Sequence, residues 1–409
     1  MFQKLTNTYH EYPRVFWMMV FVNFVDRLGG SLLFPFFALY LTRKFSIGMT
    51  EVGVLFAVFS VSSFIGAFPG GALTDRFGRK GIIIFSLIAT SVSTLFMGLV
   101  NAYQLFVVIA FISGIFTDIG SPAYEAVFID ILPQEKRASG FGIRRVAFNL
   151  AVVMGPVIGG FVASRSYLAL FIIDAVFSTL VALLVFVLIP ETRPAAPEGE
   201  KQETTAESFG GYLRVLRDGK FMAFVGASFL AWLVYVNMNT TLGVFLRDSH
   251  GVPESGYGWI LSLNAAMVVL FQFSITRRAE KYPPMLMMAL GSVFFAVGLG
   301  MYGFISSYWL FALAMGILTI GEMIAIPISN AVVASFAPDN MRGRYNFIFG
   351  NSWGISFAVG PLLAGLVMDN FNPNLLWYAC AVIGILAAFV FVVLHWRVHP
   401  RAVTVEREV

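Results

Sequence analysis

Eight charged residues interrupt long apolar stretches of the chain. Burying a charge in such a stretch costs free energy, so these residues are candidates for a functional role. They are Asp26, Arg27, Asp118, Glu125, Arg144, Arg145, Asp174 and Glu322. A charge that faces lipid at mid-depth costs roughly 2.5–3.5 kcal/mol. Eight such charges would cost on the order of 20 kcal/mol on that scale. We therefore expect these side chains to face a cavity or one another.

The eight charges comprise five acids and three arginines, which leaves an acidic excess. A carboxylate without a cationic partner can bind and release a proton and can attract a lipophilic cation. The candidates for proton or substrate binding are Asp26, Arg27, Asp118, Arg144, Asn237 and Glu322. For Asp26 and Asp118 an ion pair with an arginine is the alternative, and Asp174, which lies off-centre, is expected to be structural.

The composition shows which elements must carry these side chains. Hydrophobic residues make up 58% of the 409 residues and charged residues 12%, and the mean hydropathy is +0.79. Because a soluble domain has about 25% charged residues, we expect an integral membrane protein. One cysteine, Cys380, excludes a disulfide scaffold, and a net charge of +4 without an arginine-rich cluster argues against nucleic-acid binding.

A membrane-spanning helix needs about 20 apolar residues, and twelve stretches of the chain provide them. They lie near residues 15–41, 51–74, 81–100, 103–131, 139–163, 168–189, 220–246, 257–276, 284–304, 308–335, 344–368 and 375–395. Continuous apolar runs predict helices and exclude a barrel of alternating strands. The first run cannot be a cleaved signal peptide, because it is too long and carries two central charges.

The distribution of Lys and Arg predicts the orientation. With both termini in the cytoplasm, 20 of the 27 basic residues fall in cytoplasmic segments. The outer loops then hold only Arg43, Lys44, Arg165 and Arg247. We expect a multi-pass protein of the cell membrane, with a bacterial inner membrane as the expected location.

A polar segment divides the twelve spans into two repeats. Residues 191–219, rich in Pro, Glu, Thr and Gly, are expected to form a cytoplasmic linker that ends in a short interfacial helix from about residue 208 to 218. The linker separates a six-helix bundle at 1–190 from a second at 220–409. A shift of 205 positions brings the halves into register without a gap, and it superposes Pro122 on Pro327 and Pro156 on Pro361. Two pseudo-symmetric bundles are typical of transporters that rock around a site at the midplane.

Two motifs carry a family resemblance. The loop after the second span reads G-x-x-x-D-R-x-G-R-K, which resembles the signature of the major facilitator superfamily; its residues are Gly71, Asp75, Arg76, Gly78, Arg79 and Lys80. The fifth span resembles the antiporter motif of the twelve-helix drug:proton antiporters, with Ala151 in place of one glycine; its residues are Gly142, Gly155, Pro156, Gly159 and Gly160. Pro-Glu-Thr at 190–192 is also similar to that group, and Glu322 looks like the span-ten glutamate of some multidrug exporters.

The resemblance implies roles for both motifs. Asp75, Arg79 and Asp130 are expected to form a charge cluster that latches the bundles together when the outer face is open; simple positive-inside anchors are the alternative. Pro156 is expected to kink the fifth span, and its glycines to admit close helix contact, or else to form an ordinary packing face. The arginine that many of these antiporters carry on span four is absent, so Arg27 or Arg144 is expected to replace it.

We expect a secondary active transporter that exports amphipathic or cationic drugs in exchange for protons by alternating access. The chain has no phosphate-binding loop, clustered metal ligands or nucleophile with its base, so no ATP-driven pump, metal, cofactor or enzymatic activity is expected. The expected partners are a small-molecule substrate, protons and the lipid bilayer, with a monomer as the family's usual state. The alternatives are a proton-coupled transporter of a narrow metabolite, such as a sugar or amino-acid derivative, and a sensor or scaffold without turnover.

Overall fold

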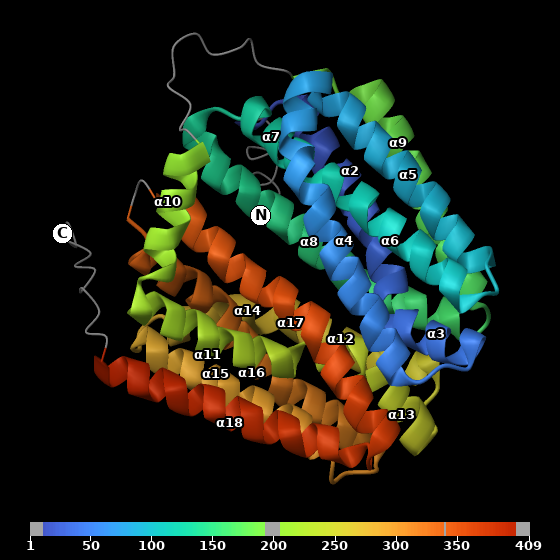
Figure 1. Ribbon diagram of the computed structural model, residues 1–409, viewed down its shortest axis with the longest axis vertical. Helices are drawn as coiled ribbons and strands as arrows, with labels where there is room; N and C mark the ends of the chain where they lie inside the picture. Colours follow the sequence, from blue (N-terminus) through green and yellow to red (C-terminus); the bar gives the residue numbers. More distant parts are fainter. Residues whose placement is uncertain (1–10, 193–204, 339–340, 398–409) are drawn as a thin grey trace. The chain divides into compact units, whose positions relative to one another are not determined.

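The computed structural model describes residues 11–192, 205–338 and 341–397 of the chain. Within these ranges the side chains of residues 68–72, 75, 134, 135, 138 and 205–210 lie outside the description. All regular secondary structure in the described ranges is helical (Figure 1). Twelve of its helical segments are long and apolar enough to cross a membrane. The prediction of an all-α protein with twelve spans is confirmed.

Contacts between Cα atoms group the described residues into two compact units. Unit 1 holds residues 11–192, 237–269 and 357–373, and unit 2 holds residues 205–236, 270–338, 341–356 and 374–397. Unit 1 thus joins the first half of the sequence to two segments of the second half. The division into bundles at 1–190 and 220–409, which rests on the sequence repeat, stays a prediction.

Within the described residues, the first half of the chain contributes nine helices to unit 1. They are α2 (Arg14–Leu33), the 3₁₀ helix η1 (Phe34–Phe36), α3 (Phe37–Phe45), α4 (Met49–Phe77), α5 (Arg79–Leu99), α6 (Tyr103–Ile119), α7 (Ser121–Ile131), α8 (Gln134–Ala163) and α9 (Tyr167–Leu188). Helix α2 packs against α8 and α9, α4 packs against α6, and α5 packs against α6 and α9. An apolar core between them includes Phe16, Met19, Ile83, Phe128 and Val185, all at most 4% exposed.

The second half supplies the remaining helices. They are α10 (Thr205–Leu216), α11 (Gly219–Tyr235), α12 (Asn237–Thr240), α13 (Leu242–His250), α14 (Glu254–Ala279), α15 (Pro284–Met301), α16 (Tyr308–Phe336), α17 (Arg342–Asn370) and α18 (Asn374–Arg397). In unit 2, α15 packs against α16 and α18, and α11 packs against α18. Helices α12 and α13 belong to unit 1, while α14 and α17 each contribute to both units. The short helix predicted in the linker is present as α10.

Three spans that the hydropathy pattern predicts as continuous are broken in the structure. The first is interrupted at η1, the fourth at Gly120, and the seventh on either side of α12. Pro35 and Pro122 each occupy the first turn of the helix that follows a break, where a missing N–H is tolerated. Pro156, Pro327 and Pro361 instead lie inside continuous helices. Proline alone therefore does not predict where a span breaks.

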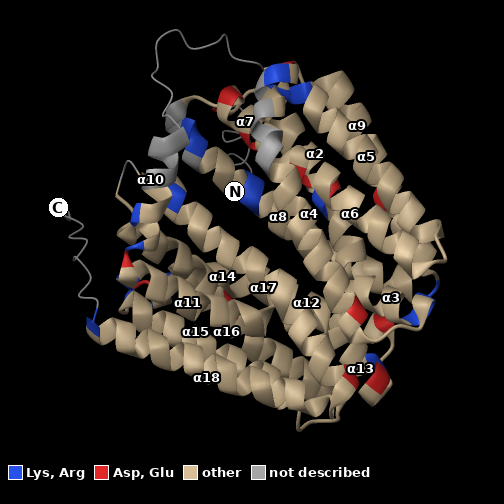
Figure 2. Ribbon diagram, viewed as in Figure 1, with Lys and Arg blue, Asp and Glu red and all other residues tan. Residues whose placement is uncertain are grey.

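Most charged residues gather at helix ends, and long tan stretches separate them (Figure 2). This pattern is expected for a protein in a bilayer, because apolar side chains can face the hydrocarbon at low free-energy cost. The few coloured positions within helices include the charged residues that the sequence indicates as candidates for binding.

Candidate functional site

A polar cavity of about 470 Å³ lies within unit 1. Side chains from α2, α5, α6, α7 and α8 line it, namely Asn23, Asp26, Arg27, Ser86, Leu87, Thr90, Thr117, Asp118, Ser121, Tyr124, Glu125, Phe141, Arg144, Arg145 and Phe148. Six of the eight charges in the apolar stretches therefore share one cavity. The structure brings together four of the predicted binding residues, Asp26, Arg27, Asp118 and Arg144.

Arg27 is the cation that Asp26 and Asp118 have in common. Its guanidinium carbon lies 5.6 Å from the centre of the Phe148 ring, a distance at which the ring face attracts a cation. Asp118 also accepts a hydrogen bond from the Ser63 hydroxyl. Both carboxylates thus lie within electrostatic range of one arginine. These three groups together carry a net charge of −1 when all are ionised, while Arg145 also lines the cavity.

Arg144 has a partner of its own. Its Nη1 lies 2.7 Å from Glu125 Oε1, and its guanidinium carbon lies 4.9 Å and 4.8 Å from the ring centres of Phe128 and Phe141. Arg144 thus contacts a carboxylate and two aromatic rings at once. This ion pair lies in the wall of the cavity and neutralises the charge of Glu125.

Asp174 is not among the residues that line the cavity, and its structural role stays a prediction. Its side chain is buried against Gly29 of α2 and is hydrogen-bonded to Thr94 of α5. Together these contacts join α9 to α2 and α5.

Glu322 belongs to unit 2, where it is hydrogen-bonded to the Tyr235 hydroxyl. Tyr235 lies in a group of rings, with centroids 5.3 Å from Phe295 and 5.7 Å from Trp353. Asn237 lies in α12 of unit 1, where its Oδ1 accepts a hydrogen bond of 3.0 Å from Thr241. Neither Glu322 nor Asn237 lines the polar cavity of unit 1.

The loop signature forms a compact charge cluster around Arg79, which is only 9% exposed. Its guanidinium pairs with Asp130 and donates to the Ala126 carbonyl at 3.1 Å. Gly78, with φ of 88°, adopts a conformation that favours glycine. The backbone N–H of Arg79 donates to Glu191 Oε1 at 2.9 Å.

Arg76 and Lys80 of the signature are more exposed than Arg79. Arg76 and Lys80 lie over the rings of Phe77 and Phe186. The surroundings of Gly71 and of the Asp75 side chain fall outside the described part of the chain. The contact of Glu191 with this cluster was not predicted, although the Pro-Glu-Thr segment that contains it is a recognisable sequence signal. The action of the cluster as a latch between bundles stays a prediction.

The glycines of the fifth-span motif lie in α8, and three of them meet other helices. A Cβ at Gly155 would collide with Ser31, and a Cβ at Gly159 with the Leu32 carbonyl. At Gly160 a Cβ would lie 3.1 Å from the Cα of Gly258. The predicted close packing is therefore present at these three positions. A Cβ at Gly142 would meet no atom of another residue within 4 Å, so this glycine contributes no such contact.

A second ionic network in unit 1 was not predicted. Glu254 at the start of α14 pairs with Arg43 at 3.1 Å and accepts from the Tyr167 hydroxyl at 2.7 Å. The Asp369 carboxylate accepts from the backbone N–H groups of Met49 and Thr50 at 2.9 and 2.7 Å. These contacts join residues 254 and 369 of the second half to the helix ends around residues 43–50. We call them the 254/369 clamp.

Helix α13 lies beside the clamp. Arg247 donates to the Leu39 carbonyl at 3.1 Å and to Thr42 at 3.0 Å. Burial lowers the pKa of His250, whose ring lies 5.1 Å from that of Phe245. A lowered pKa keeps this histidine neutral at physiological pH. Any stability that the neutral ring contributes is present above its ordinary pKa of 6.5 and is lost as the pH falls below it.

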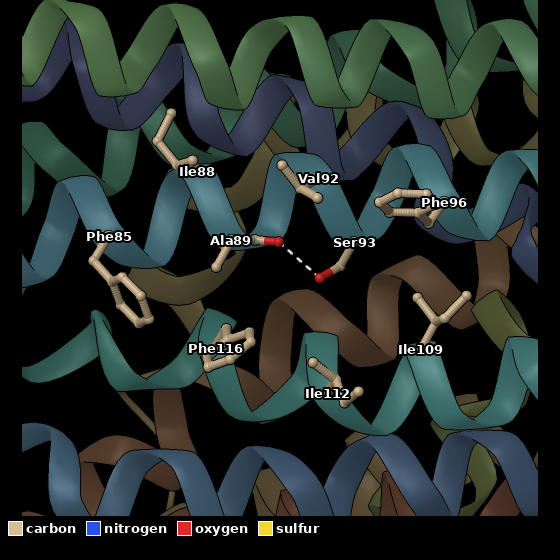
Figure 3. Close-up of a pocket in the computed structure, with 9 residues that line it drawn as sticks. All are labelled: Phe85, Ile88, Ala89, Val92, Ser93, Phe96, Ile109, Ile112 and Phe116. Carbon is tan, nitrogen blue, oxygen red and sulfur yellow. Dashed lines mark hydrogen bonds between the residues drawn. The ribbon is translucent and has the colours of Figure 1, made fainter.

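An apolar groove of about 390 Å³ runs between α5 and α6, also in unit 1 (Figure 3). Phenylalanine, isoleucine and valine side chains line it, and its one hydroxyl, from Ser93, donates back to the Ala89 carbonyl at 2.7 Å. The groove therefore offers no polar group for recognition, unlike the charged cavity.

Comparison with known proteins gives consistent results. The family model of the Major Facilitator Superfamily matches residues 19–253 and 224–408. The chain is 25% identical over 341 residues to a Na(+), Li(+), K(+)/H(+) antiporter of Planococcus maritimus, over 77% of this chain and 80% of that protein. It is 23% identical over 382 residues to the multidrug resistance protein MdtH of Shigella flexneri, over 92% of each chain.

Among solved structures, a crystal structure of a variant of the nucleoside transporter NupG superposes with a TM-score of 0.80. The superposition covers 93% of this chain and all of that one at 13% identity, a likeness that concerns the fold alone. The family model, in contrast, extends over almost the full sequence. Together with the twelve spans, this match shows that the chain belongs to the Major Facilitator Superfamily of membrane transporters.

Proposed function

We propose that this protein exports amphipathic, cationic compounds in exchange for protons, by alternating access of a site that includes the polar cavity. The observation that carries the proposal is the sharing of Arg27 by Asp26 and Asp118 within that cavity. Asp26, Arg27 and Asp118 by themselves carry one negative charge in excess, with Arg145 also in the cavity lining, and either a proton or a substrate cation can neutralise a carboxylate of this group. Because two cations cannot both be favourable there, binding of one promotes release of the other, which is the requirement for exchange.

The cavity also suits an organic cation in shape and lining. The Phe141 and Phe148 rings face the same space as the carboxylates, and aromatic faces attract cations. Glu322, hydrogen-bonded to Tyr235 in unit 2, is the second carboxylate to which we assign a proton or substrate role. The resemblance to MdtH supports an export function for the family branch.

The setting of the transporter is part of the proposal. The excess of Lys and Arg in alternate loops supports cytoplasmic termini, and we assign the protein to a bacterial inner membrane as a monomer. The Arg79–Asp130 cluster would then lie on the cytoplasmic side, where it latches the bundles in the outward-open state.

The test is ethidium flux in proteoliposomes under an imposed pH gradient. In the wild-type protein, the proton gradient should drive ethidium in the direction opposite to proton flow. Asp118→Asn should lower the initial rate of ethidium movement at least about tenfold, because the cavity then lacks one exchangeable charge. Glu322→Gln should also lower the rate. Glu280→Gln, which neutralises an exposed acid just after α14, is the matched control and should behave as wild type.

Two results would count against the proposal. Loss of flux in the Glu280 control would show that charge number alone matters. Absence of gradient-driven movement of ethidium and of a small panel of related cations would exclude multidrug export, and a transporter of a narrow metabolite would then replace it.

A second candidate function is exchange of alkali cations for protons. The relative from Planococcus maritimus, which bears that activity in its name and is matched over 80% of its length, favours it. Addition of NaCl or KCl to acid-loaded proteoliposomes would then raise the internal pH, as reported by an entrapped dye. A dye signal that does not respond to either salt excludes this candidate.

A further inference from the structure

The apolar groove and the polar cavity of unit 1 lie on adjacent faces of the same two helices, α5 and α6. In three places one residue lines the groove and the next residue of the chain lines the cavity: Phe85 and Ser86, Ala89 and Thr90, and Phe116 and Thr117. Consecutive residues of a helix point about 100° apart. The line of contact between α5 and α6 is therefore the boundary between the groove and the cavity.

Two side-chain contacts lie on this boundary, and we call their residues the α5–α6 seam. The hydroxyls of Thr90 and Thr117 lie 3.0 Å apart, and the rings of Phe85 and Phe116 meet edge to face at 5.4 Å between centroids. Thr117 also donates to the Ser113 carbonyl at 2.9 Å, so its hydroxyl accepts from Thr90. Both contacts can open by rotation about side-chain bonds, without a change of the backbone.

The groove presents only hydrocarbon to a ligand. Its hydroxyl group, from Ser93, is already bonded to the Ala89 carbonyl (Figure 3). The groove follows α5 from Phe85 to Phe96, a length of about 16 Å at 1.5 Å per residue. Val92 and Phe96 in its wall are 49% and 57% exposed, so the groove is open to the surroundings of the protein. Its length and lining suit an extended alkyl chain.

The seam lies at a depth where a polar group depends on the protein. Ala89 is the middle residue of α5 (Arg79–Leu99), which is one of the candidate spans. A polar group at the middle of a bilayer has no water to bind and costs free energy unless a cavity shelters it. The cavity provides that shelter, because Asp118 directly follows Thr117 and both line it.

We infer that the groove binds the alkyl chain of an amphipathic organic cation, whose head enters the polar cavity across the α5–α6 seam. The inference rests on the proposed function for the charge of the head and adds a second site for the chain. An alkyl chain gains little by leaving lipid, since lipid tails are equally apolar. Packing in the groove and the attached head must therefore hold the chain together. A chain without a charged head should not be retained.

The experiment uses the purified full-length protein in proteoliposomes and dodecyltrimethylammonium with a photoreactive diazirine at the end of its chain. Irradiation links the chain end to its neighbours, and mass spectrometry of peptides identifies them. In the wild type, labelling should saturate and fall on residues 85–96 and 109–116. Unlabelled dodecyltrimethylammonium should displace the probe, whereas dodecanol, which has the same chain without the charged head, should not.

The variants test the groove directly. Ala89→Trp should lower the displaceable labelling at least about fivefold, because the indole occupies the space of the chain. Leu183→Trp, the matched control, adds the same side chain at an exposed position of α9 and should be labelled as the wild type is. A variant that fails to fold is recognised by its circular dichroism and replaced by Ile112→Trp on the facing wall, for which the same loss is expected.

The outcomes separate this inference from the proposed function. Displacement by dodecanol would show that the groove holds any alkyl chain, including that of a lipid, and would overturn the inference. Equal labelling of α5, α6 and α9, or unchanged labelling of Ala89→Trp, would also overturn it, even if ethidium flux were normal. Displaceable labelling that Ala89→Trp weakens, in a protein without ethidium flux, would support the groove site and count against drug export.

Discussion

Arg79 shows how much one residue of the loop signature does within its own unit. It pairs with Asp130, donates to the Ala126 carbonyl and, through its backbone, to Glu191. These partners come from α7 and from the segment after α9, so the side chain and backbone of one residue join three parts of the chain. The loop motif predicted the Asp130 contact, but only the structure adds Glu191.

At the residue scale we predict that Arg79→Lys destabilises the protein by about 1–3 kcal/mol. Lysine keeps the charge, but its compact ammonium cannot serve the carboxylate and the carbonyl with the geometry of a guanidinium. Thermal unfolding followed by circular dichroism measures the loss. Arg76→Lys makes the same change three positions earlier on an exposed side chain and should alter stability by less than about 0.5 kcal/mol. Equal effects at both positions would argue against a special role for Arg79.

Helices α6–α7 and α16 occupy equivalent places in the repeat yet differ in form. The first pair is broken at Gly120, whereas α16 runs without a break from Tyr308 to Phe336. The shift of 205 positions superposes Gly120 on Ala325, and Pro122 on Pro327. Proline is therefore common to both halves, and the glycine is what distinguishes the broken one. Since the cavity of unit 1 lies at this break, the two halves differ in structure at equivalent positions of the repeat.

At the element scale we predict that α8 tolerates a methyl group at Gly142 and rejects one at Gly155. Gly155→Ala drives the new Cβ into Ser31, including its backbone, and should cost about 1–3 kcal/mol. Gly142→Ala meets open space and should be neutral or stabilise the helix by about 0.5–1 kcal/mol. Thermal midpoints of the two variants give the comparison. A Gly155 variant as stable as wild type would contradict the close contact of α8 with α2.

The largest-scale feature is the joining of distant segments within unit 1. Residues 254 and 369 reach helix ends near residues 43–50 through side-chain carboxylates. Asp369 places its negative charge at the N-terminus of α4, where two backbone N–H groups and the helix dipole stabilise it. In the alternating-access cycle proposed above, contacts of this kind would form and break, and the 254/369 clamp is the contact to test first.

At the scale of the whole molecule we predict that Asp369→Ala opens the clamp. The amides of Met49 and Thr50 lose their acceptor, at a cost of about 0.5–2 kcal/mol as for other helix caps. Hydrogen exchange of the peptide covering residues 46–52 should accelerate by about two- to thirtyfold, measured by mass spectrometry. Glu51→Gln changes an exposed acid in the same helical turn and should leave the rate near that of wild type. Unchanged exchange in the Asp369 variant would remove the clamp from the mechanism.

Local properties of the sequence determined the architecture. Hydropathy is summed over windows of about 20 residues, so the twelve spans could be predicted without tertiary information. The same windows revealed charges that could not face lipid at acceptable free-energy cost. Of these, Asp26, Arg27, Asp118 and Arg144 do line one cavity. The Gly-Arg loop signature identified the family because a tight turn at Gly78 and a buried Arg79 require those residue types.

Only the tertiary structure decided how the charges are paired. Arg144 was a candidate for substrate or proton binding by sequence, and the fold gives it Glu125 and two aromatic rings as partners. Contacts such as that between Met49 and Asp369 join residues 320 positions apart, and no local pattern encodes them. The break at Gly120 was equally hidden, because hydropathy does not register one missing side chain. A side chain at Gly120 would collide with the Ser86 hydroxyl of α5, a neighbour that only the packed molecule brings there.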